Sequence, residues 1–263
     1  MIHLFLSPHF DDAVLSCGGT IHQLTTANKP VVVQTVMGGV PSPSRLPDSP
    51  IVRDLHSRWA AGDDPVQARI REDFEAVTSL RASVEVMSVW LDCVYRMSAR
   101  GEALYPTEES IFGELHPEDA AARLIPSIIL PPEEPLVVVY APLGTGHHVD
   151  HQIVRNWGLA LHQYMPWVAL KFYEEYPYTN DRNAVNAALN FFLENDPPIG
   201  LSPELVTLSE ADVQAKVKAI GCYESQISTF WQDRAAMEAA TRAALIQAGG
   251  GQPGERYWRL VNG

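Results

Sequence analysis

The chain alternates between short apolar runs and longer stretches in which apolar residues recur every three or four positions. Nearly continuous apolar runs are typical of strands buried on both faces of a sheet, whereas the longer spacing predicts helices. The predicted strands lie at residues 2–8, 30–39, 83–91, 135–143 and 167–175, and the predicted helices at 13–27, 65–80, 117–130 and about 151–164. Strands separated by single helices pair in parallel through right-handed crossovers. The pattern therefore predicts an α/β fold, a three-layer Rossmann-like sandwich with a mostly parallel sheet.

Residues 39–64 do not fit this alternation. The stretch contains prolines at 41, 43, 47 and 50, and it is too long for an ordinary connection between a strand and a helix. Loops of this length are usually active-site lids or disordered segments, although composition alone fits a surface insertion equally well. We expect 39–64 to be a lid loop.

The C-terminal third of the chain changes character. Ser209 and Asp212 resemble a capping box at the start of a helix. We predict helices at 181–194, 209–226 and 231–247, a proline-rich linker at 195–204 and a final strand at 256–261. The whole chain, 1–263, is expected to be a single α/β domain in which 181–263 forms a C-terminal, mainly helical extension.

Composition excludes several classes of protein. The chain has 263 residues, 46% of them hydrophobic, which is enough for a sizeable core and argues against disorder. Its formal net charge of −13 disfavours binding to nucleic acid.

The compartment is indicated by what the sequence lacks. No apolar run approaches the roughly 18 residues of a membrane span, so no membrane association is expected. The N-terminus has no basic leader of a signal peptide, and the three cysteines lie far apart, as in proteins of a reducing compartment. We therefore expect a cytoplasmic protein. The sequence does not determine the oligomeric state, and a homo-oligomer is one possible state.

Histidines and carboxylates gather after two predicted strands. His9, Asp11 and Asp12 follow the strand at 2–8, and His148, Asp150 and His151 follow the strand at 135–143. The carboxyl ends of parallel strands form the functional edge of an open α/β sheet, so these side chains are expected to meet there. A lone Asp-Asp pair at a helix start is more often a cap, and histidines in a glycine-flanked loop are often solvated.

The spacing of these residues favours a metal site. His9 and Asp12 lie three residues apart at the entry to a helix and can converge, and His151 can supply a third ligand. Two imidazoles and one carboxylate suit Zn²⁺ and leave a position for water or substrate. Asp11 could then act as general base, and His148, oriented by Asp150 and favoured in its protonated form, could assist.

Two motifs, SPHFDDAVLSCGG and GHHVDH, resemble those of the LmbE/PIG-L zinc-dependent N-deacetylases. The resemblance runs from residue 2 to about 228, and its further matches are Arg69–Glu72, Asp92, Tyr173–Tyr178, Lys216 and Tyr223–Gln226. It implies an amide hydrolase that removes an acetyl group from a small N-acetyl sugar conjugate. It also implies zinc ligation by His9, Asp12 and His151.

The resemblance implies roles for further residues. Asp11 would be the general base, His148 and Asp150 would assist the oxyanion and the leaving group, and Arg69 and Asp92 would line the substrate pocket. Gly146 stands where some family members carry a tyrosine, and Tyr176 or Tyr178 could replace that hydroxyl.

Two other functions are compatible with some of these sequence features. Two histidines and a carboxylate also form the iron site of non-haem Fe(II) oxygenases, although those sites commonly lie in β-barrels. A non-catalytic sugar-binding module could adopt the same fold, since fold does not determine function. Such a module has no need of a base beside a metal triad, so Asp11 argues against it.

Overall fold

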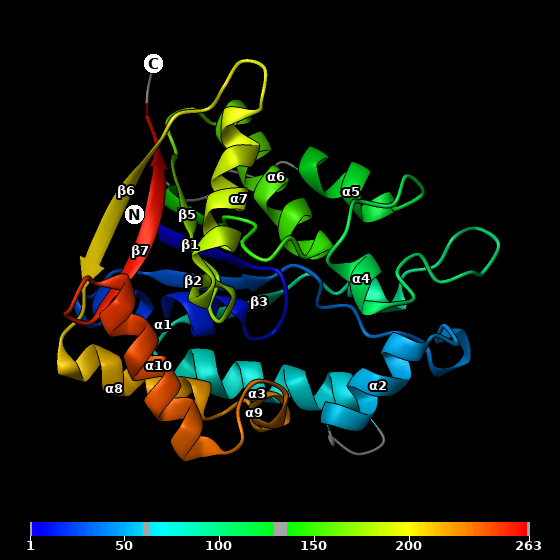
Figure 1. The fold of residues 1–263 in the computed structure, drawn as a ribbon, viewed down its shortest axis with the longest axis horizontal. Helices are drawn as coiled ribbons and strands as arrows, with labels where there is room; N and C mark the ends of the chain where they lie inside the picture. The colour runs from blue at the N-terminus through cyan, green and yellow to red at the C-terminus, as the bar shows by residue number, and fades with distance from the viewer. Residues whose placement is uncertain (1, 60–63, 129–135, 262–263) are drawn as a thin grey trace.

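The sheet of the protein is parallel over most of its width. The computed structural model describes residues 2–59, 64–128 and 136–261. Within these ranges one seven-stranded sheet has the order β3-β2-β1-β4-β5-β7-β6. Its strands are β1 (Ile2–Ser7), β2 (Val31–Thr35), β3 (Ser83–Val86), β4 (Leu136–Pro142), β5 (Ala169–Tyr173), β6 (Leu201–Thr207) and β7 (Gly254–Leu260). The first five strands are parallel, and β7 runs antiparallel to both β5 and β6 (Figure 1). The predicted fold class is confirmed.

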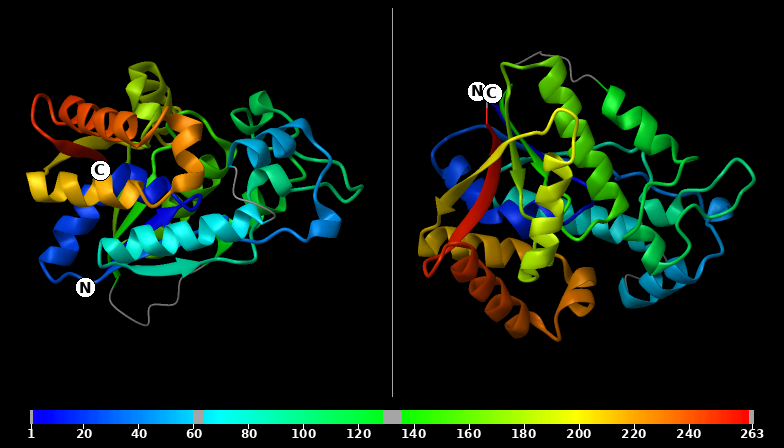
Figure 2. Two further views of the ribbon diagram at one scale, coloured as in Figure 1. Left: turned by 90° about the horizontal axis from the view of Figure 1, so that it is seen from below. Right: turned by 45° about the horizontal axis from the view of Figure 1, so that its top comes forward.

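Helices cover both faces of the sheet. The described helices are α1 (Asp12–Thr26), α2 (Pro50–Trp59), α3 (Pro65–Ser79), α4 (Glu108–Ile111), α5 (Ala120–Leu124), α6 (Val149–Tyr164), α7 (Arg182–Leu193), α8 (Glu210–Ile220), α9 (Glu224–Phe230) and α10 (Arg234–Ala248). Helices α1, α3, α8 and α10 lie on one face, and α5, α6 and α7 lie on the other (Figures 1 and 2). None of the helices in the described ranges is long and apolar enough to cross a membrane.

Each face has its own apolar core. On the first face, Val14 and Ile21 of α1 pack with Val77 of α3 and Ile220 of α8 against the sheet. On the second face, Ile153 and Trp157 of α6 and Phe192 of α7 pack on Leu6 and Phe172. Burial of this kind contributes roughly 1.5–3 kcal/mol for each large apolar side chain. The two cores pack against opposite faces of the sheet and hold the ends of its strands in place.

Several predicted elements differ from the observed ones. The strand predicted at 83–91 ends at Val86, because β3 is the outer strand and is largely exposed. The helix predicted at 117–130 is limited to α5 and a short 3-10 turn at Ile125–Ser127, where Pro126 cannot continue the α-helix; residues 129–130 lie outside the described ranges.

The C-terminal third also differs from its prediction. The proline-rich stretch at 195–204 contains the start of β6, an edge strand that tolerates Pro203. The helix predicted to run to Gln226 is two helices, α8 and α9, separated at 221–223. The capping box of Ser209 and Asp212 is present at the start of α8, as predicted.

The segment 39–64 is not wholly irregular, because it contains α2. Ile51 and Val52 of this helix are buried in a third apolar cluster, together with Phe10 and Val94. His56 Nε2 lies 2.7 Å from the hydroxyl of Tyr95. The part of the segment at 60–63 lies outside the described ranges. Residues 50–59 are therefore an ordered helix beside the functional edge, and a lid role for 39–64 stays a prediction.

Candidate metal centre and active site

The site is built where two neighbouring strands end. β1 and β4 pair in parallel, so the segments after Ser7 and after Pro142 leave the sheet side by side. The Ser7 hydroxyl donates to the carbonyl of His9 at 2.6 Å and accepts the amide of Ala13 at 3.0 Å, which closes a tight turn into α1. After β4, Gly144 and Gly146 adopt positive φ values of 89° and 84°, which turn the chain back toward the site.

The three predicted ligands converge on one carboxylate oxygen. Asp12 Oδ2 lies 3.2 Å from Nδ1 of His9 and 3.4 Å from Nε2 of His151. Ligand atoms about 2 Å from a tetrahedral ion lie roughly 3.3 Å from one another, so these two distances and the donor types fit a divalent metal. His9, His148 and His151 also form a group whose ligand nitrogens lie within 4.8 Å of one another.

Each of the two predicted histidine ligands, His9 and His151, has a buried carboxylate behind it. His9 Nε2 lies 3.0 Å from Asp150 Oδ2, and His151 Nδ1 lies 3.2 Å from Glu175 Oε1. Because a carboxylate only accepts, these nitrogens carry protons and leave the opposite nitrogens facing Asp12. Metal-ligating histidines usually have such a partner. Glu175 was missed by sequence reasoning: it lies in the motif Tyr173–Tyr178, but no spacing connects it to His151.

The carboxylates around His9 and His151 stabilise positive charge at this site. Burial lowers the pKa of His151, but Asp12 and Glu175 outweigh this and raise it to about 9. Burial likewise opposes ionisation of Asp12, yet His151 and His9 hold the pKa of its carboxyl well below the usual value. A divalent cation between these groups would replace the imidazole proton as the source of positive charge.

Asp150 has a different partner from the one predicted. Its carboxylate contacts His9 instead of orienting His148, while its backbone N–H donates to His148 Nδ1 at 3.2 Å. With Nδ1 accepting, His148 carries its proton on Nε2. Burial, reinforced by His9 and His151, holds the pKa of His148 well below its usual value. The accepting role of Nδ1 and the lowered pKa both favour a neutral His148 ring that donates through Nε2–H, whereas the sequence led us to expect the protonated form.

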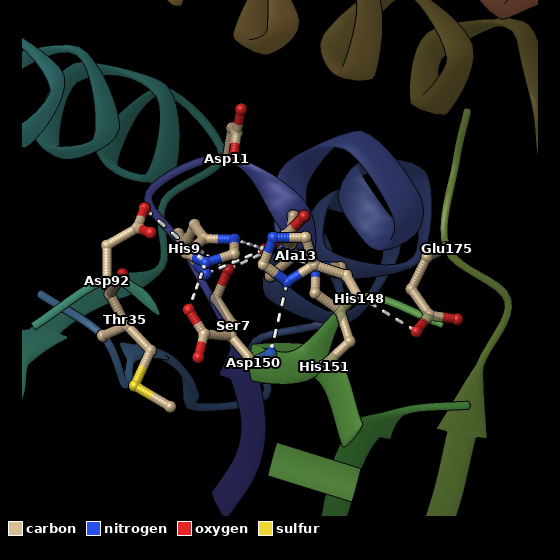
Figure 3. A network of polar contacts seen from close by, with 12 residues as sticks. Ser7, His9, Asp11, Ala13, Thr35, Asp92, His148, Asp150, His151 and Glu175 are labelled. Atoms are coloured by element: carbon tan, nitrogen blue, oxygen red, sulfur yellow. Dashed lines mark hydrogen bonds and ion pairs between the residues drawn. The ribbon is translucent and has the colours of Figure 1, made fainter. Parts of the chain in front are cut away.

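The adjacent carboxylates of Asp11 and Asp12 have separate environments. Asp11 points away from the histidine cluster (Figure 3). Its cationic partner is Arg69, whose Nη2 lies 3.4 Å from Asp11 Oδ1. Burial raises the pKa of Asp11 to about 6, and Arg69 limits the rise. Carboxylates whose pKa values are driven apart are typical of groups with different chemical roles.

Arg69 and Asp92 line one cavity, and Nη1 of Arg69 lies 4.0 Å from Oδ2 of Asp92. Their role in substrate binding stays a prediction. The cavity has a volume of about 300 Å³, and its lining includes the predicted metal ligands and Asp11. The apolar residues of its lining are Leu15, Ile51, Leu55, Val94, Ile111, Phe112 and Phe230.

Tyr178 also faces this cavity. A Cβ at Gly146 would lie 2.7 Å from Cγ of Tyr178, so the tyrosine ring fills the space that a side chain at 146 would need. Its ring centroid is 6.0 Å from that of His151. Tyr176 lines the cavity too, but its ring stacks on Trp231 with centroids 6.1 Å apart.

Known proteins are similar to this chain in sequence and in fold. The 2'-N-acetylparomamine deacetylase of Niallia circulans is 30% identical over 198 residues, or 68% of each chain. The zinc-inhibited form of teicoplanin deacetylase superposes with a TM-score of 0.81 at 25% identity, covering 100% of this chain and 99% of that one. The A40926 pseudoaglycone deacetylase superposes with a TM-score of 0.75 at 26% identity, covering 98% and 96%.

These relatives are N-deacetylases, which are hydrolases that act on amides. The family model described as PIG-L, GlcNAc-PI de-N-acetylase, matches residues 4–162, which include both motifs of the site. The chain belongs to the PIG-L family of de-N-acetylases.

Proposed function

We propose that the protein is a zinc-dependent hydrolase that removes the acetyl group from an N-acetylated amino sugar conjugate. Zn²⁺ would be held by His9 Nδ1, Asp12 Oδ2 and His151 Nε2. The observation that carries the proposal is the approach of both histidines to Asp12 Oδ2, with a separate carboxylate, Asp11, lining the same cavity. Family membership supports a hydrolase over an Fe(II) oxygenase with the same ligand set.

The residues around the metal divide the reaction between them. When bound, the ion would polarise the amide carbonyl and acidify water. Asp11 would accept a proton from the attacking water and pass it to the leaving nitrogen, so that the C–N bond breaks and acetate and an amine are released. His148 would donate its Nε2–H to the oxyanion that forms as the carbonyl carbon becomes tetrahedral.

Tyr178 is the better placed of the two candidate tyrosines. Its ring occupies the side-chain space of Gly146 and lies beside His151 at the cavity wall. We assign it as a hydrogen-bond donor to the substrate near the scissile amide.

The cavity lining supports an amphipathic substrate. Arg69 and Asp92 offer polar contacts to a sugar near the metal ligands, and the apolar lining residues of α2 and α4, with Phe230, fit a less polar attached group. One relative is a 2'-N-acetylparomamine deacetylase, and another is a teicoplanin deacetylase whose structure has been solved in complex with teicoplanin. Because the net charge is −13, a neutral or weakly charged conjugate is favoured over a polyanion.

The direct test is a panel of N-acetylated amino sugars, free and conjugated, incubated with the zinc-loaded protein. Release of a primary amine and of acetate in equal amounts is the expected result. The Asp11→Asn variant, loaded with zinc in the same way, is the matched control for background hydrolysis. If no N-acetyl sugar is cleaved while another amide or an ester is turned over, the substrate class is wrong. A turnover that needs Fe(II) and a 2-oxoacid would refute the hydrolase.

A further inference from the structure

A buried chain of polar groups extends from the metal centre into the segment between β3 and β4. It starts at His9 and continues through Asp150 to Arg96, whose Nη2 donates to Asp150 Oδ1. The same Nη2 lies 3.0 Å from Asp119 Oδ2, and the hydroxyl of Tyr105 donates to that oxygen at 2.8 Å. Asp119 and Asp150 are fully buried, and Arg96 is 8% exposed. Charged side chains at such depth are retained only when they are paired.

Arg96 determines how Asp150 is oriented. One oxygen of Asp150 accepts from Arg96, and the other accepts from the backbone N–H of Cys93 at 2.9 Å and from His9 Nε2 at 3.0 Å. Both oxygens are therefore held, so the carboxylate cannot turn away from the imidazole. The orientation of the His9 ring, with Nδ1 toward Asp12, follows from this arrangement.

The guanidinium is itself held in one position. Its Nη1 donates to the carbonyl of Leu91 at 3.0 Å, and its carbon lies 5.4 Å from the ring centroid of Tyr105. Contacts to two carboxylates, a carbonyl and a ring face use the planar fork of arginine, which a lysine ammonium does not reproduce.

Resting on the proposed function, we propose that Arg96 is a positioning residue for the metal centre, which holds Asp150 so that Asp150 presents His9 to the ion. Arg96 contacts neither the ion nor the substrate in this role. Its replacement should weaken metal binding and leave the Michaelis constant of the metal-saturated protein unchanged. Loss of an outer partner of this kind typically costs about 10–100-fold in metal affinity.

The experiment compares zinc dissociation constants, measured by competition with a chromogenic chelator, among four proteins. These are the wild type, Arg96→Met, Arg96→Lys and the control Lys216→Met. Lys216 is also a buried cation, paired with Glu255 at 2.7 Å, but it has no contact with the metal centre. We expect a dissociation constant about 10–100-fold higher in Arg96→Met, a smaller rise in Arg96→Lys, and a wild-type value in Lys216→Met despite its lower melting temperature.

Two outcomes would overturn the proposal: wild-type affinity in Arg96→Met, or an equal loss of affinity in Lys216→Met. If Arg96→Met does not fold, Arg96→Lys takes its place, and a wild-type dissociation constant in that variant overturns the proposal. The measurement needs no turnover. A wild type that binds zinc but hydrolyses no amide would refute the proposed function alone.

Discussion

The two histidines of the proposed metal centre are supported in different ways. Behind His9, Asp150 is held by the side chain of Arg96 and by one backbone amide. Behind His151, Glu175 is held by the backbone amides of Gly144 and Thr145, at 2.7 and 3.1 Å. One support depends on a buried side-chain cation, and the other on the conformation of a loop.

This difference predicts how each support can be lost. A side-chain cation can be removed by one substitution, which leaves its carboxylate buried without a counter-charge. Backbone amides remain after any substitution except proline, so we expect the Glu175 side to be less sensitive to single substitutions outside Glu175 and the loop that it contacts. The variants below test the comparison, from the largest expected effect to the smallest.

His9→Ala and His151→Ala should both lose most of their zinc, because two remaining ligands hold the ion far less well than three. Metal content after zinc loading and gel filtration, measured by mass spectrometry, checks this. Such a loss in both variants would show that His9 and His151 are equally important for zinc binding. Full zinc content in either variant would remove that histidine from the ligand set.

Asp11→Asn should lower turnover by about 10²–10⁴-fold and retain zinc, because an amide cannot accept the proton of water. Asp11 contacts neither Asp150 nor Glu175 in these supports. The Asp11→Asn variant therefore distinguishes a loss of turnover from a loss of bound zinc. Loss of zinc from this variant would contradict the assignment of Asp11 as base.

The wild-type pH profile tests the same base. Asp11 acts only when ionised, and burial raises its pKa to about 6. Activity should therefore be lost as the pH falls through about 6, and a bound cation would move this limb to lower pH. A profile flat to pH 4 with retained zinc would contradict the role.

Asp150→Asn and Glu175→Gln should both weaken zinc binding, each by about 10–100-fold. The larger loss is expected for Asp150→Asn, because Arg96 would then face a neutral amide in a buried site. Glu175→Gln keeps an oxygen that can accept from Gly144 and Thr145. Chelator competition measures both constants, and a larger loss in Glu175→Gln would reverse the comparison.

Gly144→Ala should have the smallest effect. Its φ of 89° disfavours a Cβ by about 1–2 kcal/mol of folding free energy. The new Cβ would lie 2.7 Å from Nη1 of Arg155, the end of a flexible side chain that can shift. We expect a lower melting temperature and a modest rise in the zinc dissociation constant. Unchanged values of both would show that the Glu175 support does not depend on this loop conformation.

Local patterns in the sequence were sufficient for the parallel half of the fold and for the place of the site. Buried runs separated by helical spacing predicted β1, β2, β4 and β5, because such patterns report burial on two faces directly. The convergence of His9, Asp12 and His151 followed, since the carboxyl ends of parallel strands meet at one edge.

Elements whose stability comes from distant partners were not predictable in this way. β6 is half exposed and begins in a proline-rich stretch, so its sequence resembles a linker. Its pairing with β7, which makes it a strand, is seen only in the structure. α2 lies in a stretch rich in prolines, and its burial depends on Phe10, Val94 and their neighbours in a separate cluster.

The supports of the metal ligands show the same limit most clearly. By sequence, Asp150 is two residues from His148 and 141 residues from His9, yet its carboxylate contacts His9. Glu175 and Arg96 likewise meet their partners across 24 and 54 residues. Spacing along a chain determines which side chains can share one turn or one helix face. Which buried carboxylate meets which imidazole is decided only when the strands pack, because charges buried in the core must find their partners there.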